Sequence, residues 1–410
     1  HEDILEQADE TDAVFGELYS WYLRNPEYRS RVQKLVQSAF AGKPKDIISQ
    51  SVAKALYGEV SPYSATRLER FAACAFAHFL QYGMKLTERV EYEFKPMDMG
   101  NVMHEALESF AEEVRKRGMK WTELTEQERN EIADRCLDNI VADYGNTVLK
   151  SSARNEYMIE RTRRILRRTV WALQKQLEQG EFQPEGFEVT FGGGRIDRVD
   201  IMEDQNKVYV KVIDYKTGNT SFDLVYLYHG LQLQLMIYLD GALRVEQKKY
   251  PDKEIIPAGV FYYNIKDPMI QEKIDADVEA VSAGLMKELK MNGLVQADPE
   301  LVYRMDSSLG SIPVAFNKDG SFRKNSSVAD RTQFAVLGRY VRTKIEKIRS
   351  SILEGDAEVS PYELGKKNAC TYCPYMTVCG FDRRLSGYEF RRLKNFSDEE
   401  LWKAFDREAE

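Results

Sequence analysis

The sequence predicts an α/β fold in which a mixed central sheet is flanked by helices. Residues 194–197 and 208–216 have the pattern of two strands, and the turn residues at 204–206 fold the second strand back alongside the first. Residues 226–245 have the apolar spacing of a helix, and residues 258–263 have the pattern of a further strand. A helix between two strands is typical of a right-handed crossover to a parallel neighbour, so the sheet should contain both antiparallel and parallel pairs.

Further helices are predicted on both sides of these strands in the chain. Apolar residues recur at helical spacing in 65–82, in 103–114, in two or three stretches within 119–180, in 276–292 and in 331–353. Residues 309–326 are polar and contain Gly and Ser, which indicates a linker or a hairpin. We expect three parts of the chain: a helical segment (1–60), a central domain (61–385) and a C-terminal helical tail (386–410).

The composition describes a chain that can bury a sizeable core. It has 410 residues, 43% of them hydrophobic, and a formal net charge of −8. No apolar run of about 18 residues occurs and the first residues resemble no signal peptide, so we expect a cytoplasmic protein without a membrane span. The lack of an initiator Met indicates a fragment of a longer protein. Because the net charge is negative, nucleic-acid binding would need a local basic surface or bound metal cations.

Two acidic residues and a lysine lie near the ends of the predicted strands. Side chains alternate between the faces of a strand, so Asp214 and Lys216 project to one side, and the hairpin turn can bring Asp197 close to Asp214. Carboxylates hold divalent ions, and an ammonium group stabilises the attacking water or the charge on phosphorus. This set suits metal-assisted phosphodiester hydrolysis. The alternative is a surface hairpin with an Asp–Lys ion pair.

Three other features each allow a functional and a structural interpretation. His104 lies at the border of an apolar helical stripe, where it is either a half-buried structural residue or a metal ligand. Gln234 and Tyr238 are four residues apart and share a helical face, which suits nucleic-acid contact or a buried polar pair. Residues 161–168 contain five arginines, which form either a solvated helix face or a phosphate-tracking surface.

The cysteines indicate a metal site rather than disulfides. Five cysteines without secretory features point to a reducing compartment. Cys370, Cys373 and Cys379 have the spacing Cys-x2-Cys-x5-Cys of a metal knuckle. Three thiolates leave a tetrahedral centre one ligand short, and Cys74 and Cys136 are the candidates for the fourth. Zinc and an iron-sulfur cluster both suit four thiolates.

The order of these motifs resembles the RecB-like branch of the PD-(D/E)XK nuclease superfamily. The matching residues are Gly-x-Ile-Asp at 194–197, Ile-Asp-Tyr-Lys-Thr-Gly at 213–218, Gln-x3-Tyr at 234–238 and Gly-x3-His-x2-Leu-Glu at 100–108. The resemblance implies a restriction-endonuclease-like fold. It also implies a site with one or two Mg²⁺ ions ligated by His104, Asp197, Asp214 and the Tyr215 carbonyl.

The same resemblance assigns roles to the remaining motif residues. Lys216 would orient or activate the attacking water, and Gln234 with Tyr238 would position the DNA backbone. The cysteine pattern is similar to the iron-sulfur staple of AddB-type nucleases, which makes Cys74 the fourth ligand of a 4Fe-4S cluster beside Cys370, Cys373 and Cys379. Such a cluster would tie the C-terminal part of the chain to the helix that precedes the nuclease sheet.

The family implies cleavage of single-stranded DNA as it leaves a helicase, during double-strand-break processing for recombination. The expected partner is an AddA-type helicase/nuclease subunit, and the expected substrate is the strand that ends 5′. No Gly-x4-Gly-Lys-[Ser/Thr] loop occurs, so this chain should not hydrolyse ATP itself. Two alternatives share the motifs: a stand-alone iron-sulfur exonuclease of the kind found in CRISPR adaptation, and a catalytically silent DNA-binding scaffold.

Overall fold

The computed structural model describes most of the chain. The described residues are 10–39, 47–58, 64–87, 96–143, 152–192, 194–270, 277–385 and 387–409. The predicted domain boundaries near residues 60 and 386 lie outside the described residues, as does Gly193. No helix in the described part is both long and apolar enough to cross a bilayer.

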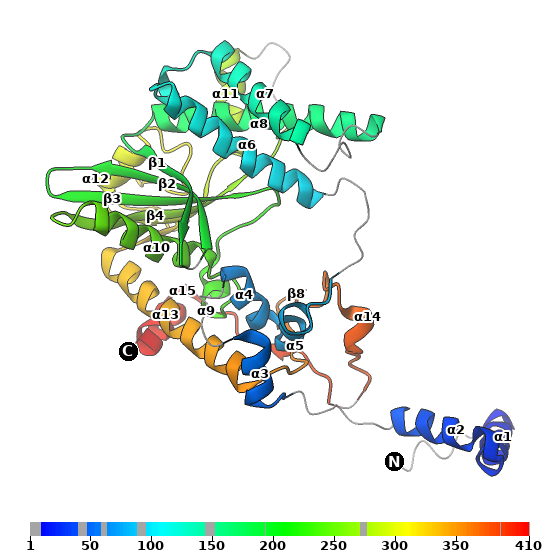
Figure 1. The fold of residues 1–410 in the computed structure, drawn as a ribbon. Coiled ribbons are helices and arrows are strands. Elements are labelled where there is room, and N and C mark those ends of the chain that lie inside the picture. The colour runs from blue at the N-terminus through cyan, green and yellow to red at the C-terminus, as the bar shows by residue number, and fades with distance from the viewer. Residues whose placement is uncertain are drawn as a thin grey trace.

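A six-stranded mixed sheet forms the centre of the molecule (Figure 1). Its strands follow one another in chain order: β1 (Gln183–Phe191), β2 (Gly194–Glu203), β3 (Lys207–Lys216), β4 (Glu254–Asn264), β5 (Asn292–Gln296) and β6 (Val328–Ala329). The pairs β3–β4 and β5–β6 are parallel, and the other neighbours are antiparallel. The mixed sheet predicted from the sequence is confirmed, with β2 and β3 joined by the expected turn.

Helices cover both faces of the sheet (Figure 1). On one face lie α6 (Pro96–Lys116), α7 (Glu126–Asp143) and α8 (Ala153–Glu178), and on the other lie α10 (Gln234–Lys249), α13 (Arg331–Glu354) and α15 (Asp398–Ala409). Strand alternation assigns the side chains of β3 to two cores. Tyr209, Ile213 and Tyr215 belong to the core beneath α6, whereas Val208 and Val212 belong to the core beneath α10.

The crossover from β3 to β4 contains two helices rather than one. α9 (Leu224–Tyr228) ends before Gly230, whose φ of +78° is rarely adopted by residues with a side chain, and α10 begins at Gln234. The prediction of one helix over 226–245 is therefore wrong at its start. This break places the N-terminus of α10 beside the end of β3, where the Lys216 ammonium donates to Gln234 at 2.8 Å.

The predicted helix over 65–82 is also interrupted, at Cys74. α4 (Ala65–Ala73) ends there because Cys74 has an extended backbone, with φ −166° and ψ 118°. α5 (Ala75–His78) and a π-helical turn (Phe79–Gly83) follow. An uninterrupted helix would keep Cys74 on a helical face, whereas the extended residue turns its thiol toward the C-terminal cysteines.

The remaining elements surround this framework. They are α1 (Glu10–Arg24), α2 (Pro26–Ala39), α3 (Gln50–Tyr57), a 3₁₀ turn (Trp121–Glu123), α11 (Val278–Glu288), α12 (Pro299–Met305), α14 (Met376–Cys379) and a small sheet of β7 (Tyr362–Leu364), β8 (Lys367–Asn368) and β9 (Arg391–Arg392). The predicted helix over 276–292 is shorter than expected, because its last residue already belongs to β5. The predicted hairpin at 309–326 is confirmed by a bridge between Phe316 and Phe322.

Candidate active site

Three carboxylates form a row across neighbouring strands. In the β2–β3 ladder Arg198 pairs with Ile213, which places Asp197 beside Asp214. In the β1–β2 ladder Phe187 pairs with Arg198 and Val189 with Ile196, so Glu188 occupies the corresponding place on β1. The hairpin therefore brings Asp197 and Asp214 together as the sequence predicts. It also adds Glu188, which the sequence reasoning did not select.

His104 reaches this row from α6. Its Nδ1 lies 3.3 Å from Asp197 Oδ2 and 3.9 Å from Glu188 Oε1. In the part of the chain that the structure describes, these three residues form a group whose ligand atoms all lie within 4.8 Å of one another. Asp197 is fixed further by the Tyr215 backbone N–H, which donates to its Oδ2 at 2.7 Å. An imidazole and two carboxylates thus converge at one end of the sheet.

Glu188 owes its position to an irregular strand. The β1–β2 register shifts between Pro184 and Gly186, and Glu188 itself has φ +49°. Its carboxylate pairs with Arg195 on β2 as well as lying near His104. The signal in the sequence was the alternation of residues 186–191, which places Glu188 opposite Asp197 once the hairpin is drawn; the left-handed backbone could not be read from it.

A second chain of contacts starts at Asp214. Its Oδ2 lies 2.5 Å from Lys216 Nζ, and that ammonium also donates to Gln234 Oε1 at 2.8 Å. The Gln234 amide in turn donates to the Tyr238 hydroxyl at 2.9 Å. The structure therefore joins the four residues predicted from this part of the site. It separates them from the compact group of three, because Asp214 is not a member of that group.

Glu69 on α4 supports this chain from below. Its Oε1 accepts from the backbone N–H groups of Leu233 at 2.7 Å and Gln234 at 2.9 Å, which are at the N-terminus of α10. A carboxylate suits this place because these amides have no partner within the helix and carry partial positive charge. Sequence reasoning passed over Glu69, since no motif spacing links α4 to a helix that begins 165 residues later.

The concentration of acids changes their protonation. Burial and the Asp197 carboxylate raise the pKa of Asp214 to about 7, although Lys216 opposes the shift. Burial and Asp197 raise the pKa of Glu188 to about 7 in the same way. Burial lowers the pKa of His104, but its hydrogen bond to Asp197 and the surrounding carboxylates outweigh this, and the net shift is upward. The site therefore has more negative charge than its own cations balance.

The comparisons with known proteins bear on this geometry. The family model described as the PD-(D/E)XK nuclease superfamily matches residues 62–380, which include every residue of the row and of the Lys216 chain. The chain belongs to the PD-(D/E)XK nuclease superfamily. The predicted fold class and the resemblance stated from the motifs are thereby confirmed.

Curated relatives of this superfamily member share one name, which describes each as a subunit of an ATP-dependent helicase/deoxyribonuclease. The protein of Lachnoclostridium phytofermentans is 41% identical over 99% of this chain and 37% of its own length. Those of Thermoanaerobacter sp. and Clostridium acetobutylicum are 34% and 33% identical, each over 98% of this chain and 37% of their own length. The PD-(D/E)XK chain thus spans little more than a third of the relatives it matches.

The four cysteines named from the sequence lie together in this nuclease fold. The thiols of Cys74, Cys373 and Cys379 act electrostatically on Cys370, and together with burial they raise its pKa to about 12. All four line one cavity. Cys136 instead lies in the core between α6 and α8. Of the two candidates for the fourth ligand, the structure therefore places only Cys74 with the others.

The arginine-rich helix of the nuclease is largely paired with its own neighbours. Arg163 pairs with Asp138 at 2.7 Å, Arg167 pairs with Asp134, and Arg164 pairs with Asp267 at 2.5 Å. The Arg168 guanidinium lies over the ring of Trp171. These contacts favour the solvated helix face over the phosphate-tracking surface.

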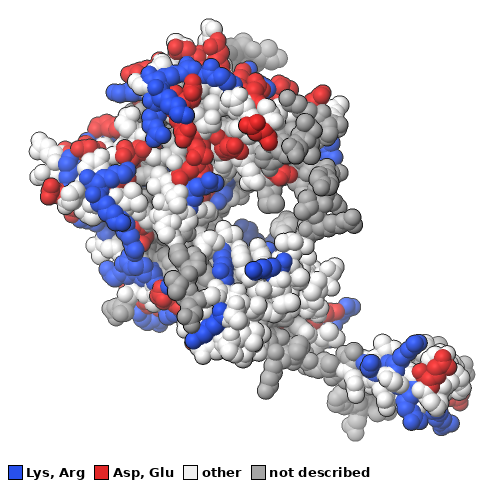
Figure 2. All heavy atoms as spheres, viewed as in Figure 1, with Lys and Arg blue, Asp and Glu red and all other residues white. Residues whose placement is uncertain are grey.

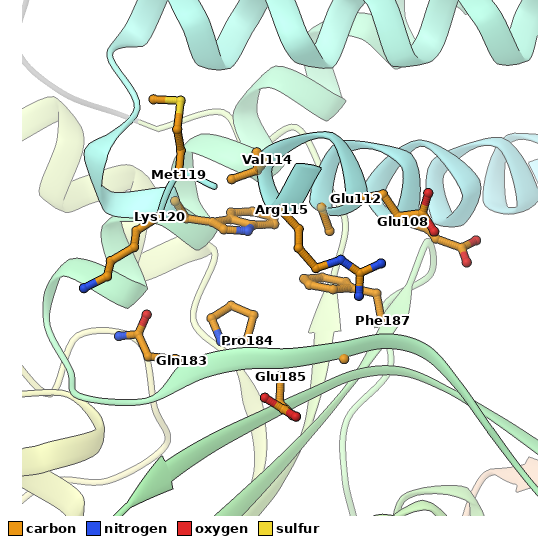
Figure 3. Close-up of a pocket in the computed structure, with 13 residues that line it drawn as sticks. Glu108, Glu112, Val114, Arg115, Met119, Lys120, Gln183, Pro184, Glu185 and Phe187 are labelled. Atoms are coloured by element: carbon orange, nitrogen blue, oxygen red, sulfur yellow. The ribbon is translucent and has the colours of Figure 1, made fainter. Parts of the chain in front are cut away.

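A cavity beside the row lies between α6 and β1 (Figure 3). Trp121 and Phe187 stack within it, with ring centroids 5.8 Å apart. Glu108 and Glu112 on α6 and Glu185 on β1 lie around it (Figure 3). It contains none of the candidate site residues, and its acidic rim is unsuited to a phosphate backbone.

Proposed function

We propose that this domain hydrolyses phosphodiester bonds of single-stranded DNA in a reaction that depends on a divalent metal. The observation that carries the proposal is the convergence of His104, Glu188 and Asp197 beside the Asp214–Lys216 pair. Carboxylate oxygens and one imidazole suit Mg²⁺ or Mn²⁺, and the raised pKa values of Asp214 and Glu188 mark a site that lacks positive charge. The donor set therefore fits a divalent cation.

Each residue has a distinct task in this proposal. His104, Asp197 and Asp214, with the Tyr215 carbonyl, would hold the ion, and Glu188 is added as a further ligand from β1. When bound, the ion would polarise the phosphate and activate water. Lys216, held by Asp214 and Gln234, presents its ammonium to the attacking water or to the phosphate oxygen. Gln234 and Tyr238 position the DNA backbone next to it.

The test is cleavage of an end-labelled single strand in the presence of Mg²⁺. Asp214→Asn should reduce kcat by at least about a hundredfold, the scale seen when one charge-stabilising group is removed. Asp252→Asn, an exposed aspartate outside the site, is the matched control and should cleave normally. Normal cleavage by Asp214→Asn would refute the assignment. A wild-type chain that binds DNA but never cuts it would be the silent scaffold.

The names of the relatives extend the proposal to the whole complex. We infer that the chain is the nuclease part of a helicase-nuclease subunit, paired in the cytoplasm with an AddA-type subunit. Cleavage of the strand ending 5′ during double-strand-break repair is the corresponding substrate proposal. The match covers nearly all of this chain in each of these relatives, which supports this interpretation over a stand-alone CRISPR-type exonuclease.

We further propose that Cys74, Cys370, Cys373 and Cys379 hold a 4Fe-4S cluster with a structural role. Backbone N–H groups of Phe76, Ala77 and Ser360 donate to the Cys74 sulfur, as suits an anionic ligand. Four thiolates bound to one zinc ion would lie about 3.8 Å apart, given Zn–S distances near 2.3 Å. The cysteines, all within the described residues, form no group as compact as the 4.8 Å one at His104. Wider spacing suits a cluster of several metal atoms.

A further inference from the structure

An open groove runs along the outer side of α10, between the end of β1 and α13. Its volume is about 560 Å³, within the range of pockets that hold organic ligands. Apolar residues form its floor: Leu68, Phe191, Met236, Ile237, Val341 and Ile345. Gly192 and Gly338 leave space at its walls, because a Cβ at Gly192 would meet no atom within 4 Å and one at Gly338 only the tip of Arg342, at 3.7 Å.

The groove adjoins the candidate active site. Phe191 lines the groove and packs edge-on against Tyr238, with ring centroids 5.9 Å apart. Tyr238 is the last residue of the contact chain that begins at Asp214. Gly241 lies three residues further along α10 and lines the groove, so one side of this helix leads from the site to the groove. A polymer bound at the site needs to pass only one layer of side chains to enter it.

The rim of the groove is basic although the protein is acidic overall. Arg244, Lys248, Arg342 and Arg349 line it, against a single acidic residue, Asp240. Asp240 is shared by two of these arginines, at 2.7 Å from Arg244 and 2.9 Å from Arg342. Figure 2 shows basic side chains gathered on the side of the molecule where Figure 1 shows α10 and α13. This side therefore differs in charge from the acidic cavity between α6 and β1.

We propose that this groove binds single-stranded DNA next to the nucleotide at the active site. The phosphates lie along the four rim cations and the bases lie against the apolar floor, the combination found in sequence-tolerant binding of single strands. The proposal rests on the proposed function, because it extends the path of the same strand. An acidic peptide would match the rim equally but would have no bases for the floor, and it is an outcome of the test.

Binding is measured by fluorescence anisotropy with labelled oligothymidylate, using the full chain in the Asp214→Asn background so that nothing is cut. Lys248→Ala/Arg342→Ala should weaken binding about tenfold. It should also lower the slope of log K against log salt concentration by about 1.4, since each phosphate contact on a single strand contributes about 0.7. Arg161→Ala/Arg164→Ala removes two exposed cations from α8 and should leave both quantities unchanged.

A second variant tests the floor without removing charge. Gly338→Leu adds a side chain where the structure has room, and it raises helix propensity within α13, so it should fold. It should weaken binding of long oligonucleotides and raise their KM in otherwise wild-type protein. It should leave kcat and the cleavage of very short substrates unchanged.

The outcomes separate the two proposals. Loss of binding in the α8 control to the same extent, or unchanged binding in both Lys248→Ala/Arg342→Ala and Gly338→Leu, overturns the groove. In that case the groove takes another occupant, such as an acidic peptide. A wild-type chain that binds through the groove but does not cleave would leave this inference standing and remove the hydrolytic proposal instead.

Discussion

At the scale of single residues, the site is dominated by acids that repel one another. Asp197, Asp214 and Glu188 stand in one row, and Lys216 and Arg195 are the cations that contact them. A carboxyl group that is buried beside another carboxylate retains its proton to higher pH. The folded chain without metal therefore binds more protons near neutral pH than the unfolded chain does, and this excess is measurable.

We predict that the metal-free protein loses stability as pH rises toward neutrality. The pKa of Asp214 is raised from 3.8 to about 7, and that of Glu188 from 4.5 to about 7. Between the unfolded and folded values the native state holds more protons, so the free energy of unfolding falls with rising pH. Mg²⁺ binds the ionised form, so it should raise the melting temperature more at pH 8 than at pH 5. Calorimetry with and without Mg²⁺ measures both effects.

His78 requires a control in this experiment. Burial lowers its pKa to about 3, so it contributes stability that increases with pH up to about 6.5 and opposes the effect of the acids. Asp197→Asn isolates the site, because it removes the charge that raises the pKa of both other carboxyls. That variant should show a flatter pH profile and little response to Mg²⁺. An unchanged Mg²⁺ response in Asp197→Asn would contradict the metal assignment.

At the scale of elements, the sequence predicted the parts that local pattern determines. The turn at 204–206 and the alternation of β3 were enough to place Asp197 beside Asp214 and to direct Lys216 to the same face. The motif residues Gln234 and Tyr238 were likewise expected on one helical face. These features depend on neighbours within a few tens of residues, which is the range over which strand and helix periodicity is informative.

The features that the sequence did not predict depend on distant contacts. The helix break at Cys74 reflects the position of cysteines about 300 residues later, and the start of α10 at Gln234 is capped by Glu69 from α4. Glu188 needed a register shift and a left-handed backbone to face His104. Periodicity alone would continue each helix and strand through these points.

We predict that Glu69 positions the catalytic lysine through α10. Glu69→Leu would leave the Leu233 and Gln234 N–H groups without their acceptor and should cost roughly 2–4 kcal/mol of stability. It should also lower kcat, since Gln234 holds Lys216. Glu69→Gln keeps an acceptor oxygen and should restore most of both. Chemical denaturation and single-turnover cleavage of the folded protein measure the two effects.

Asp330 provides the matched comparison for Glu69. It caps α13 with its own side chain, accepting from Gln333 N–H at 2.8 Å, and lies outside the site. Asp330→Ala should cost about 1 kcal/mol of stability and leave kcat unchanged. If Glu69→Leu also lost only stability, with kcat per folded molecule intact, the positioning role would be refuted.

At the scale of the whole molecule, distant parts of the chain meet at the cysteines. α4 and α5 precede the sheet, whereas residues 358–392 follow α13, and the two parts share few bonds. Phe76 N–H donates to Glu358 O at 3.0 Å, and the Tyr375 hydroxyl donates to Leu86 O at 3.0 Å. A cluster at Cys74 and Cys370 would close a loop of about 300 residues, which on a loop-entropy estimate stabilises the fold by several kcal/mol.

We predict that Cys74→Ser removes the cluster and releases the C-terminal part of the chain, whereas Cys136→Ser does neither. The cysteines differ because Cys74 faces Cys370 while Cys136 is buried in the core beneath α6. Iron and sulfide content, with broad visible absorbance, report the cluster. Limited proteolysis reports release, which should appear as new cleavage within residues 358–392. A colourless wild-type protein containing one zinc per chain would replace the iron-sulfur assignment, and iron retained in Cys74→Ser would refute the role of Cys74.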